Sequence, residues 1–341
     1  MLHFDSDYME TGHPAIIKRF AELGLKQSCG YGFDEITLGA AKKIAEACGK
    51  PDALVKFLVG GTQANATVID ALLKNYEGVI ALDSGHVSGH EAGAIEASGH
   101  KVLNLRGENG KITESGLQAF LNDFFADENW EHTVIPGMVY VSHPTERGTL
   151  YTKAELTALR KICDQYHLYL YLDGARLGYG LTADGTDLTL SDIADLCDAF
   201  YIGGTKVGAM CGEAVVFPNP DLVGYFMTHI KQHGALMAKG WILGAQFDVL
   251  FENDLYYRIA RHANEMAYLI RDELKAKGYR FFIDSPTNQQ FIVIDKKQEE
   301  ELKKHTTYGF WCKYDDEHTV IRFATSWATQ EENVKKLLRI L

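Results

Sequence analysis

The stretch that decides the fold is DAFYIGGTKVGAMCG, residues 198–212. An apolar run from Ala199 to Ile202 ends in two glycines, Thr205 and Lys206, and more small residues follow the lysine. The pattern predicts a buried strand that brings a lysine to the edge of a sheet, with open space around it. Lysine is rarely buried without a partner, and a desolvated amine loses its proton more easily. Lys206 is therefore a candidate nucleophile for a Schiff base, either with a carbonyl substrate or with pyridoxal phosphate (PLP). A strand-end lysine that pairs with a carboxylate on the sheet rim fits this stretch equally well.

A second stretch, LYLYLDGARLGYG at 168–180, favours the cofactor. An apolar strand ends there at Asp173, and Arg176 follows shortly after. PLP needs a carboxylate beside its pyridine nitrogen, because a protonated nitrogen makes the ring an electron sink. Alone, Asp173 could equally cap a helix or hold a turn. The pair of Asp173 and Lys206 is far more specific than either residue.

Together, these two stretches resemble the signature of the PLP-dependent threonine aldolase and β-eliminating lyase family. Its members typically carry H-x-D-G-A-R and then S-K or T-K. The resemblance extends from FDSDY at 4–8 to TVIRFATSW at 319–327. It implies an α/β chain of fold type I, with a mainly parallel seven-stranded sheet between helices in a large domain and a small C-terminal α/β domain. It also implies that PLP forms a Schiff base with Lys206 and that Thr205 contacts the cofactor.

Composition limits the class of protein. The chain has 341 residues, 46% of them hydrophobic, which is enough for one large domain and a smaller one. We expect an N-terminal arm and helix (1–52), a large PLP-binding domain (53–250) and a small C-terminal domain (251–341). A net charge of −12 argues against a nucleic-acid partner. The six cysteines lack metal-site or C-x-x-C spacing, so we expect reduced core thiols and no metal. Without a signal peptide or an apolar run of about 18 residues, we expect a cytoplasmic protein without a membrane span.

A glycine turn at 60–63 is the candidate phosphate cradle. Residues 53–61, ALVKFLVGG, read as a strand, and GGTQANATVIDALL then opens a helix. A helix N-terminus offers free N–H groups and a positive dipole end to a phosphate. Gly60, Gly61, Thr62 and Gln63 form this cradle in our interpretation, although a plain strand–helix turn with a threonine cap fits locally as well. The first strand–helix turn is where fold type I enzymes hold the PLP phosphate.

Two histidines are candidates for acid–base chemistry. Residues 78–83, 87–98 and 101–105 read as strand, helix and strand, which places His86 in the loop after the first strand; His90 lies one turn further on. The resemblance makes His86 the residue that stacks on the cofactor ring and a possible acid or base. His143 falls where family aldolases have the histidine of E-N-T-H, but here the motif is Y-V-S-H, followed by Glu146 and Arg147. This departure leaves the substrate side chain open.

The candidate residues lie at equivalent places in the predicted sheet. Strands that alternate with helices indicate a mainly parallel sheet, in which ligands bind beyond the carboxyl ends of the strands. Gly61, His86, His143, Asp173 and Lys206 all fall at such ends. This convergence follows from the residues alone.

Further roles come only from the resemblance. It implies that Ser6 and Arg322 hold the carboxylate of an amino acid and that Arg176 supports the cofactor's 3-oxygen and the substrate. It also implies that the loop of Tyr31 reaches into the site of a neighbouring subunit. The family's phosphate-binding arginine is absent from KQHGALMAKGW at 231–241, where Lys239 is a possible substitute. Read locally, these residues are ordinary loop polarity and, for Arg322, a solvent-facing salt bridge. Residues 279–341 read as strand, strand, helix, strand, strand, helix.

The expected activity is PLP-dependent aldol cleavage of β-hydroxy-α-amino acids, such as threonine and allo-threonine, to glycine and an aldehyde. His86, His143 or a bound water is the expected base for the 3-hydroxyl. A PLP-dependent β-eliminating lyase or aminotransferase is the alternative within the class, and a non-catalytic PLP-fold scaffold is the alternative outside it. The expected partner is a small amino acid. Shared sites imply a homodimer or homotetramer.

Overall fold

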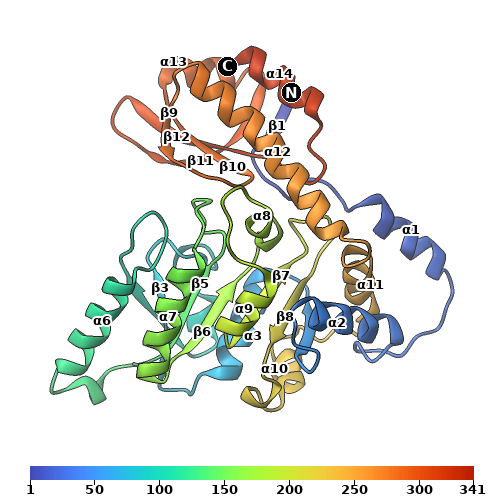
Figure 1. Cartoon of the computed structure of the whole chain (residues 1–341), viewed down its shortest axis with the longest axis vertical. Coiled ribbons are helices and arrows are strands. Elements are labelled where there is room, and N and C mark those ends of the chain that lie inside the picture. Colours follow the sequence, from blue (N-terminus) through green and yellow to red (C-terminus); the bar gives the residue numbers. More distant parts are fainter.

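A computed structural model describes residues 1–341 as two lobes joined by a long helix (Figure 1). The larger lobe is built on a seven-stranded sheet with the order β2-β8-β7-β6-β5-β3-β4. Its strands are β2 (Leu54–Leu58), β8 (Glu213–Phe217), β7 (Ala199–Gly203), β6 (Tyr169–Asp173), β5 (Ile135–Ser142), β3 (Glu77–Leu82) and β4 (Lys101–Leu105). Six of these strands run in one direction, and β8, between β2 and β7, runs in the opposite direction. The segment 204–212 is too short for the crossover that a parallel strand needs, which is about a dozen residues or more.

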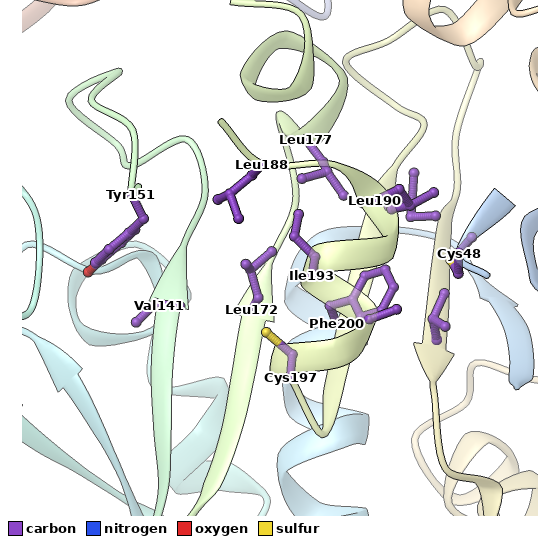
Figure 2. Close-up of a cluster of buried hydrophobic side chains, with 14 of the residues drawn as sticks. Cys48, Val141, Tyr151, Leu172, Leu177, Leu188, Leu190, Ile193, Cys197 and Phe200 are labelled. Atoms are coloured by element: carbon purple, nitrogen blue, oxygen red, sulfur yellow. The ribbon is translucent and has the colours of Figure 1, made fainter. Parts of the chain in front are cut away.

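Helices cover both faces of this sheet because successive strand residues point to opposite faces. Val139 and Val141 pack in one hydrophobic cluster, and Met138 and Tyr140 in another. The first cluster, part of which Figure 2 shows, includes residues of α2 (Glu35–Ala47), α6 (Glu114–Ala126), α7 (Lys153–Tyr166), α8 (Leu177–Leu181), α9 (Leu190–Leu196) and α11 (Trp241–Leu250). The second includes residues of α3 (Gly61–Leu72), α5 (Ala94–Ala97) and α10 (Phe226–Gln232). The mainly parallel α/β prediction is confirmed.

One predicted helix is wrong in its extent. Residues 87–98 form two single turns, α4 (His86–Gly89) and α5, instead of one helix. Ala92 and Gly93 between them have φ values of 52° and 73°, a left-handed conformation that ends a helix. His86 therefore begins α4 instead of lying in a loop.

The smaller lobe combines both ends of the chain. Its five-stranded sheet has the order β1-β11-β12-β10-β9. The strands are β1 (Leu2–Phe4), β9 (Arg280–Ile283), β10 (Gln289–Asp295), β11 (Thr306–Lys313) and β12 (His318–Ala324). The helices are α13 (Lys296–Leu302) and α14 (Glu331–Ile340), together with α12 (Leu255–Ala276), which extends from the larger lobe (Figure 1). The predicted element order of residues 279–341 is confirmed, and β1 adds an N-terminal strand to this sheet.

Three short elements complete the chain: α1 (Pro14–Leu23) and the 3-10 turns Trp130–His132 and Pro220–Leu222. No helix combines the length and apolar character needed to cross a bilayer. All six cysteines are free thiols, but only Cys48, Cys163 and Cys197 are buried. The prediction of core thiols is therefore wrong for Cys29, which is exposed.

Candidate active site

A cavity of about 370 Å³ lies at the carboxyl ends of the large sheet's parallel strands. Eight of the residues predicted from sequence line it: Gly60, Gly61, Thr62, His86, Asp173, Arg176, Thr205 and Lys206. Among the other lining residues are Tyr8, Ser142, Glu146, Tyr201, Cys211 and Glu213. Residues from distant parts of the chain thus meet where parallel α/β sheets bind ligands.

Lys206 lies three positions beyond β7, in a turn that only small residues allow. A Cβ atom on Gly203 would lie 2.4 Å from the carbonyl oxygen of Ala175, and one on Gly204 would lie 2.7 Å from that of Gly212. Burial, together with the positive charge of Arg176, lowers the pKa of the Lys206 amine. A larger fraction of this amine is neutral and nucleophilic than in a solvent-exposed lysine.

Asp173 ends β6 and accepts four hydrogen bonds. Its Oδ1 accepts from the Tyr201 hydroxyl at 2.5 Å and from the Ala175 N–H at 2.9 Å. Its Oδ2 accepts from the Tyr140 hydroxyl at 2.5 Å and from Asn65 Nδ2 at 3.1 Å. Four donors and no acceptor are the partners that suit an ionised carboxylate. Burial raises the pKa of both tyrosines well above the ordinary value, so they remain donors.

His86 is held by a buried carboxylate. Its Nδ1 lies 2.7 Å from Glu91 Oε1, and the same oxygen accepts from Asn65 Nδ2 at 2.7 Å. Asn65 also bonds Asp173, so one chain of contacts joins the histidine to the strand-end aspartate. The imidazole lines the cavity while Glu91 lies behind it, out of solvent. The ring of His90 has its centroid 5.7 Å from that of His86.

The N-terminus of α3 faces the cavity without a side-chain cap. Gly60 is its N-cap residue and makes no capping side-chain bond, so the N–H groups of the first turn remain available to an anion. A Cβ atom on Gly60 would meet nothing within 4 Å, which shows open space at this point. The structure does not place Gln63 in the cavity, because its Oε1 turns back to accept from the Val59 N–H.

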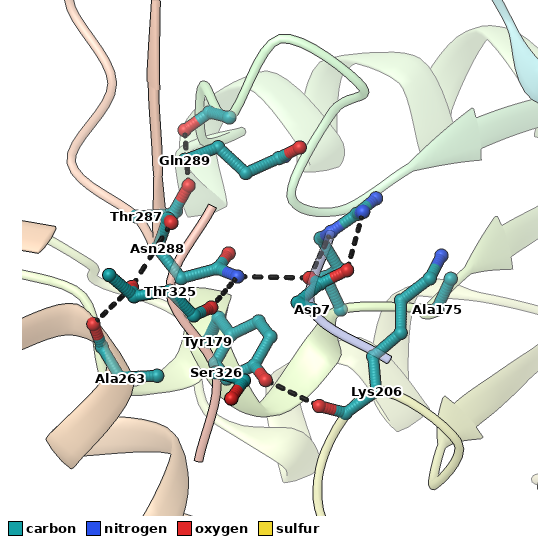
Figure 3. Close-up of polar contacts among 12 residues, drawn as sticks. Asp7, Ala175, Tyr179, Lys206, Ala263, Thr287, Asn288, Gln289, Thr325 and Ser326 are labelled. Carbon is teal, nitrogen blue, oxygen red and sulfur yellow. Dashed lines mark hydrogen bonds and ion pairs between the residues drawn. The ribbon is translucent and has the colours of Figure 1, made fainter. Parts of the chain in front are cut away.

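A buried ion pair closes the side of the cavity toward the small lobe. Asp7 accepts from Arg176 Nε at 2.7 Å and Nη2 at 2.9 Å, and from Asn288 Nδ2 at 2.9 Å. Figure 3 shows Asp7 beside Asn288 and Lys206. Although burial alone would raise it, the charges of Arg176, Lys206 and Arg322 hold the pKa of Asp7 far below its usual range. Neither the predicted Ser6 nor its neighbour Asp7 lines the cavity, and Asp7 acts on it through Arg176, which does.

Arg322 lies next to this pair on β12. Its Nη1 donates to Gln289 Oε1 at 2.9 Å and its Nη2 to the Asp5 carbonyl at 2.7 Å, while its buried Nε has no partner. Burial, and then the nearby charge of Arg176, lowers the pKa of Arg322. The expected solvent-facing salt bridge is absent. Two adjacent guanidinium groups and an unpaired N–H suit an anion such as a carboxylate.

The structure does not bring His143 into the cavity. Its side chain is fully buried, its Nδ1 accepts from the Tyr151 N–H at 3.3 Å, and burial lowers its pKa to about 4. A neutral, enclosed imidazole cannot reach a substrate, which corrects its assignment as a catalytic base. Glu146 lines the cavity instead and accepts from the His86 N–H at 3.0 Å and the Ser142 hydroxyl at 2.7 Å. Burial raises the pKa of Glu146.

Tyr31 lies outside this cavity. It lines a neighbouring apolar cavity with Gly32 and Gly240, and its N–H donates to the Ala238 carbonyl at 3.0 Å. The exposed Lys239 directly follows Ala238, so this possible phosphate-binding lysine lies beside the Tyr31 loop.

Several site residues escaped the sequence reasoning: Asn65, Glu91, Tyr140, Tyr201 and Glu213. Tyr140, Asp173 and Tyr201 point to the α3 face of the sheet, as strand alternation dictates. The two tyrosines could have been identified from sequence, because polar and apolar residues alternate at the ends of their strands. Nothing local distinguishes Glu91 from the other helix-flanking glutamates.

These residues fit PLP. An uncapped helix N-terminus, a carboxylate with four donors and a lysine with a lowered pKa meet in one cavity, and these are the groups that a phosphate, a pyridinium nitrogen and an aldehyde require.

Comparisons with known proteins agree with this geometry. The low-specificity L-threonine aldolase of Pseudomonas aeruginosa is 30% identical over 339 residues, which is 98% of this chain and 96% of that one. The solved structure of Leishmania major threonine aldolase matches with a TM-score of 0.97 and 40% identity, covering 100% and 98% of the two chains. A mutant Thermus thermophilus aspartate aminotransferase shares the fold, with a TM-score of 0.67 and 17% identity over 100% and 92% of the chains. The expected fold type I is confirmed, and family and fold together imply PLP. A family model described as "Beta-eliminating lyase" matches residues 3–297, and the chain therefore belongs to the β-eliminating lyase family.

Proposed function

We propose that this chain cleaves the Cα–Cβ bond of β-hydroxy-α-amino acids, such as threonine and allo-threonine, releasing glycine and an aldehyde, with PLP bound covalently to Lys206. The observation that carries the proposal is the meeting of Lys206, Asp173 and the uncapped α3 N-terminus in one cavity. The two most similar relatives described above are threonine aldolases, which favours this reaction over other PLP chemistry.

The chain's own residues divide the work. PLP, when bound, supplies an electron sink for the pair released at Cα. Asp173, fixed by four donors, holds the positive charge of the pyridine nitrogen, and the first-turn N–H groups of α3 hold the phosphate. Thr205 also lines the cavity and is a further candidate for this phosphate site, although its hydroxyl donates to Glu213 in the structure. The lowered pKa of Lys206 leaves its amine ready to attack and, later, to exchange a proton.

Substrate binding falls to the two arginines, Arg176 and Arg322. Asp7 fixes the plane of Arg176 through two hydrogen bonds, and the small lobe supplies Arg322. The His86 imidazole then takes the proton of the 3-hydroxyl at Nε2, because its Nδ1 is turned toward Glu91. The backbone of His86 is itself held by Glu146, which fixes the ring's position in the cavity wall.

We also propose that the enzyme is a homodimer or a larger even assembly with shared sites, and that it works in the cytoplasm. Tyr31 is 45% exposed and Phe33 59% exposed beside the open apolar cavity, and Tyr8 at the cavity mouth is 56% exposed. Exposed aromatic side chains in one region favour a protein partner, and a second copy brings its Tyr31 loop to the first copy's site. The six free thiols suit a reducing compartment.

The test uses purified chain loaded with PLP. The visible absorption of lysine-bound cofactor should appear in wild type and in Lys297→Ala, a control at an exposed lysine of the small lobe, and vanish in Lys206→Ala. L-threonine and L-allo-threonine should then yield acetaldehyde and glycine in equal amounts. A bound cofactor without acetaldehyde, but with a keto acid, would move the assignment to β-elimination or transamination. If no cofactor absorption appears at all, the remaining assignment is a non-catalytic scaffold with the PLP fold.

Light scattering coupled to size-exclusion chromatography tests the assembly. The expected mass is an even multiple of the 38.0 kDa chain. Phe33→Glu should shift the mass toward one chain and lower activity with it. A monomeric wild type that retains full activity contradicts the shared site.

A further inference from the structure

Glu213 is a buried carboxyl group at the phosphate end of the candidate active site. It begins β8 and pairs in register with Leu58 of β2 on one side and with Gly203 of β7 on the other. Strand β2 leads directly into Gly60 and the start of α3, so Glu213 lies beside the proposed phosphate cradle. It is 4% exposed and lines the cavity.

The Thr205 hydroxyl has a single proton, and it donates that proton in a hydrogen bond to Glu213. The Thr205 hydroxyl donates to Glu213 Oε1 at 2.8 Å, and the Gly204 N–H donates to Oε2 at 3.1 Å. The Thr205 oxygen accepts from the Gly212 N–H at 3.1 Å. In this arrangement Thr205 faces the cavity but has no proton left for a phosphate oxygen.

An ionised Glu213 conflicts with a bound phosphate. A phosphate monoester carries nearly two negative charges at neutral pH, and like charges in a partly buried site repel strongly. The hydrogen bonds of Glu213 come from two neutral groups, Gly204 and Thr205, so no cation neutralises the carboxylate by direct contact.

We propose that Glu213 is a neutral carboxylic acid whenever phosphate is bound, and that its O–H donates to Thr205 so that the Thr205 hydroxyl turns to the phosphate. The inference rests on the proposed function, since it takes the phosphate of PLP as the ligand. No proton passes between the two side chains: Thr205 keeps its own proton and rotates, while Glu213 uses a proton taken from solvent. Every donor and acceptor of Thr205 is then satisfied.

Burial favours this protonated form. It raises the pKa of Glu213 to about 8, in spite of the opposing effects of the Thr205 hydrogen bond and the Lys206 charge. Asp173 adds a further upward contribution. The charged or titratable groups that face Glu213 from the surrounding elements are Lys206, Asp173, Cys211, Tyr171, Tyr201 and Tyr256. A bound phosphate dianion raises the pKa further, so binding above pH 8 must take up a proton.

The experiment measures binding of pyridoxamine 5′-phosphate to the cofactor-free chain between pH 7 and 9.5. This probe forms no bond with Lys206, and its phosphate does not titrate in that range because its second pKa is about 6. The dissociation constant of wild type, divided by that of Glu213→Gln, should rise about tenfold from pH 7 to pH 9. Dividing the two constants cancels the titration of the free probe, and the same ratio measured in a Lys206→Ala background removes the titration of Lys206, whose charge interacts with that of Glu213. Glu96→Gln, the same change at an exposed carboxyl outside the cavity, should leave the wild-type rise in place.

Calorimetry supplies a second test, on wild type and Glu213→Gln together. Titrations in buffers of different ionisation enthalpy should show equal proton uptake by the two proteins near pH 7, and an excess in wild type that rises toward one proton per site at pH 9. A ratio of dissociation constants that stays constant within about twofold, or an excess uptake that does not rise, overturns the proposal. A probe that binds neither wild type nor variant at any pH overturns the cofactor assignment itself, and this proposal with it.

Discussion

Replacing Asp7 by asparagine should destabilise the chain far more than an isosteric exchange usually does. Asp7 has no exposed surface and makes two hydrogen bonds to Arg176 and one to Asn288. The asparagine side chain keeps the shape but removes the negative charge that faces a buried guanidinium. Breaking a buried ion pair from one side costs about 3–5 kcal/mol, because the remaining charge is left uncompensated.

The expected shift in melting temperature follows from the chain length. At about 2.1 cal/mol/K per residue, 341 residues give an unfolding entropy of about 0.7 kcal/mol/K. A loss of about 3–5 kcal/mol therefore lowers the melting temperature by about 4–7 °C, which differential scanning calorimetry resolves easily. The matched control is Asp184→Asn, which breaks the exposed pair with Arg261 at 3.4 Å. That change should cost less than about 1 kcal/mol.

The pH dependence gives a second check. The pKa of Asp7 in the folded chain lies well below the unfolded value of about 3.9. Its contribution is therefore fully present above about pH 4 to 5 and is lost only as the pH falls toward the folded value. The difference between wild type and Asp7→Asn should stay constant from pH 8 to pH 5. A melting shift no larger than that of Asp184→Asn, or one that disappears by pH 6, would refute the reasoning.

Three further predictions follow from other contacts. Glu91→Gln removes the charge that orients His86 at 2.7 Å, so kcat for threonine cleavage should fall about tenfold or more with the cofactor still bound. The same change at the exposed Glu96 should have no effect. Equal kcat values for wild type and Glu91→Gln in steady-state assays would contradict this role. Gly203→Ala places a Cβ atom 2.4 Å from a backbone oxygen and should cost about 3 kcal/mol or more in urea unfolding, and wild-type stability would show that the turn can move. Gly39→Ala, in α2 with nothing within 4 Å of the new Cβ atom, should instead stabilise by about 0.5–1 kcal/mol in the same assay, and a loss would point to a hidden contact.

The site residues that could be predicted from sequence are those whose place follows from one local rule, which is that they lie at the carboxyl end of a strand. Asp173 is the last residue of an apolar strand, and Lys206 and Gly61 each lie three positions beyond one; the carboxyl ends of such strands share one edge of a parallel sheet. Their convergence needed only the alternation of strands and helices. The same rule placed His86 correctly in the cavity, even though the helix after it is broken at Ala92.

The rule failed where the direction of a side chain decided the outcome. His143 directly follows β5, as Lys206 nearly follows β7, yet it turns into the core toward Tyr151. Gln63 lies in the first turn of α3, but its side chain folds back on Val59. Sequence places a backbone at the site; the rotamer that neighbouring elements allow decides whether the side chain enters it.

The residues that were missed share a different property, which is that each acts through another residue. Glu91 contacts His86, Asn65 contacts Asp173, and Glu213 contacts Thr205. Such partners have no signature of their own, because their chemistry is defined by what the fold places opposite them. Two of them are carboxyl groups buried beside a site that binds an anionic cofactor in our proposal. For Glu213, protonation therefore matters as much as position. For Glu213 the neutral form is the one that leaves the Thr205 hydroxyl free for phosphate, so a residue that sequence reasoning passed over decides how the predicted one works.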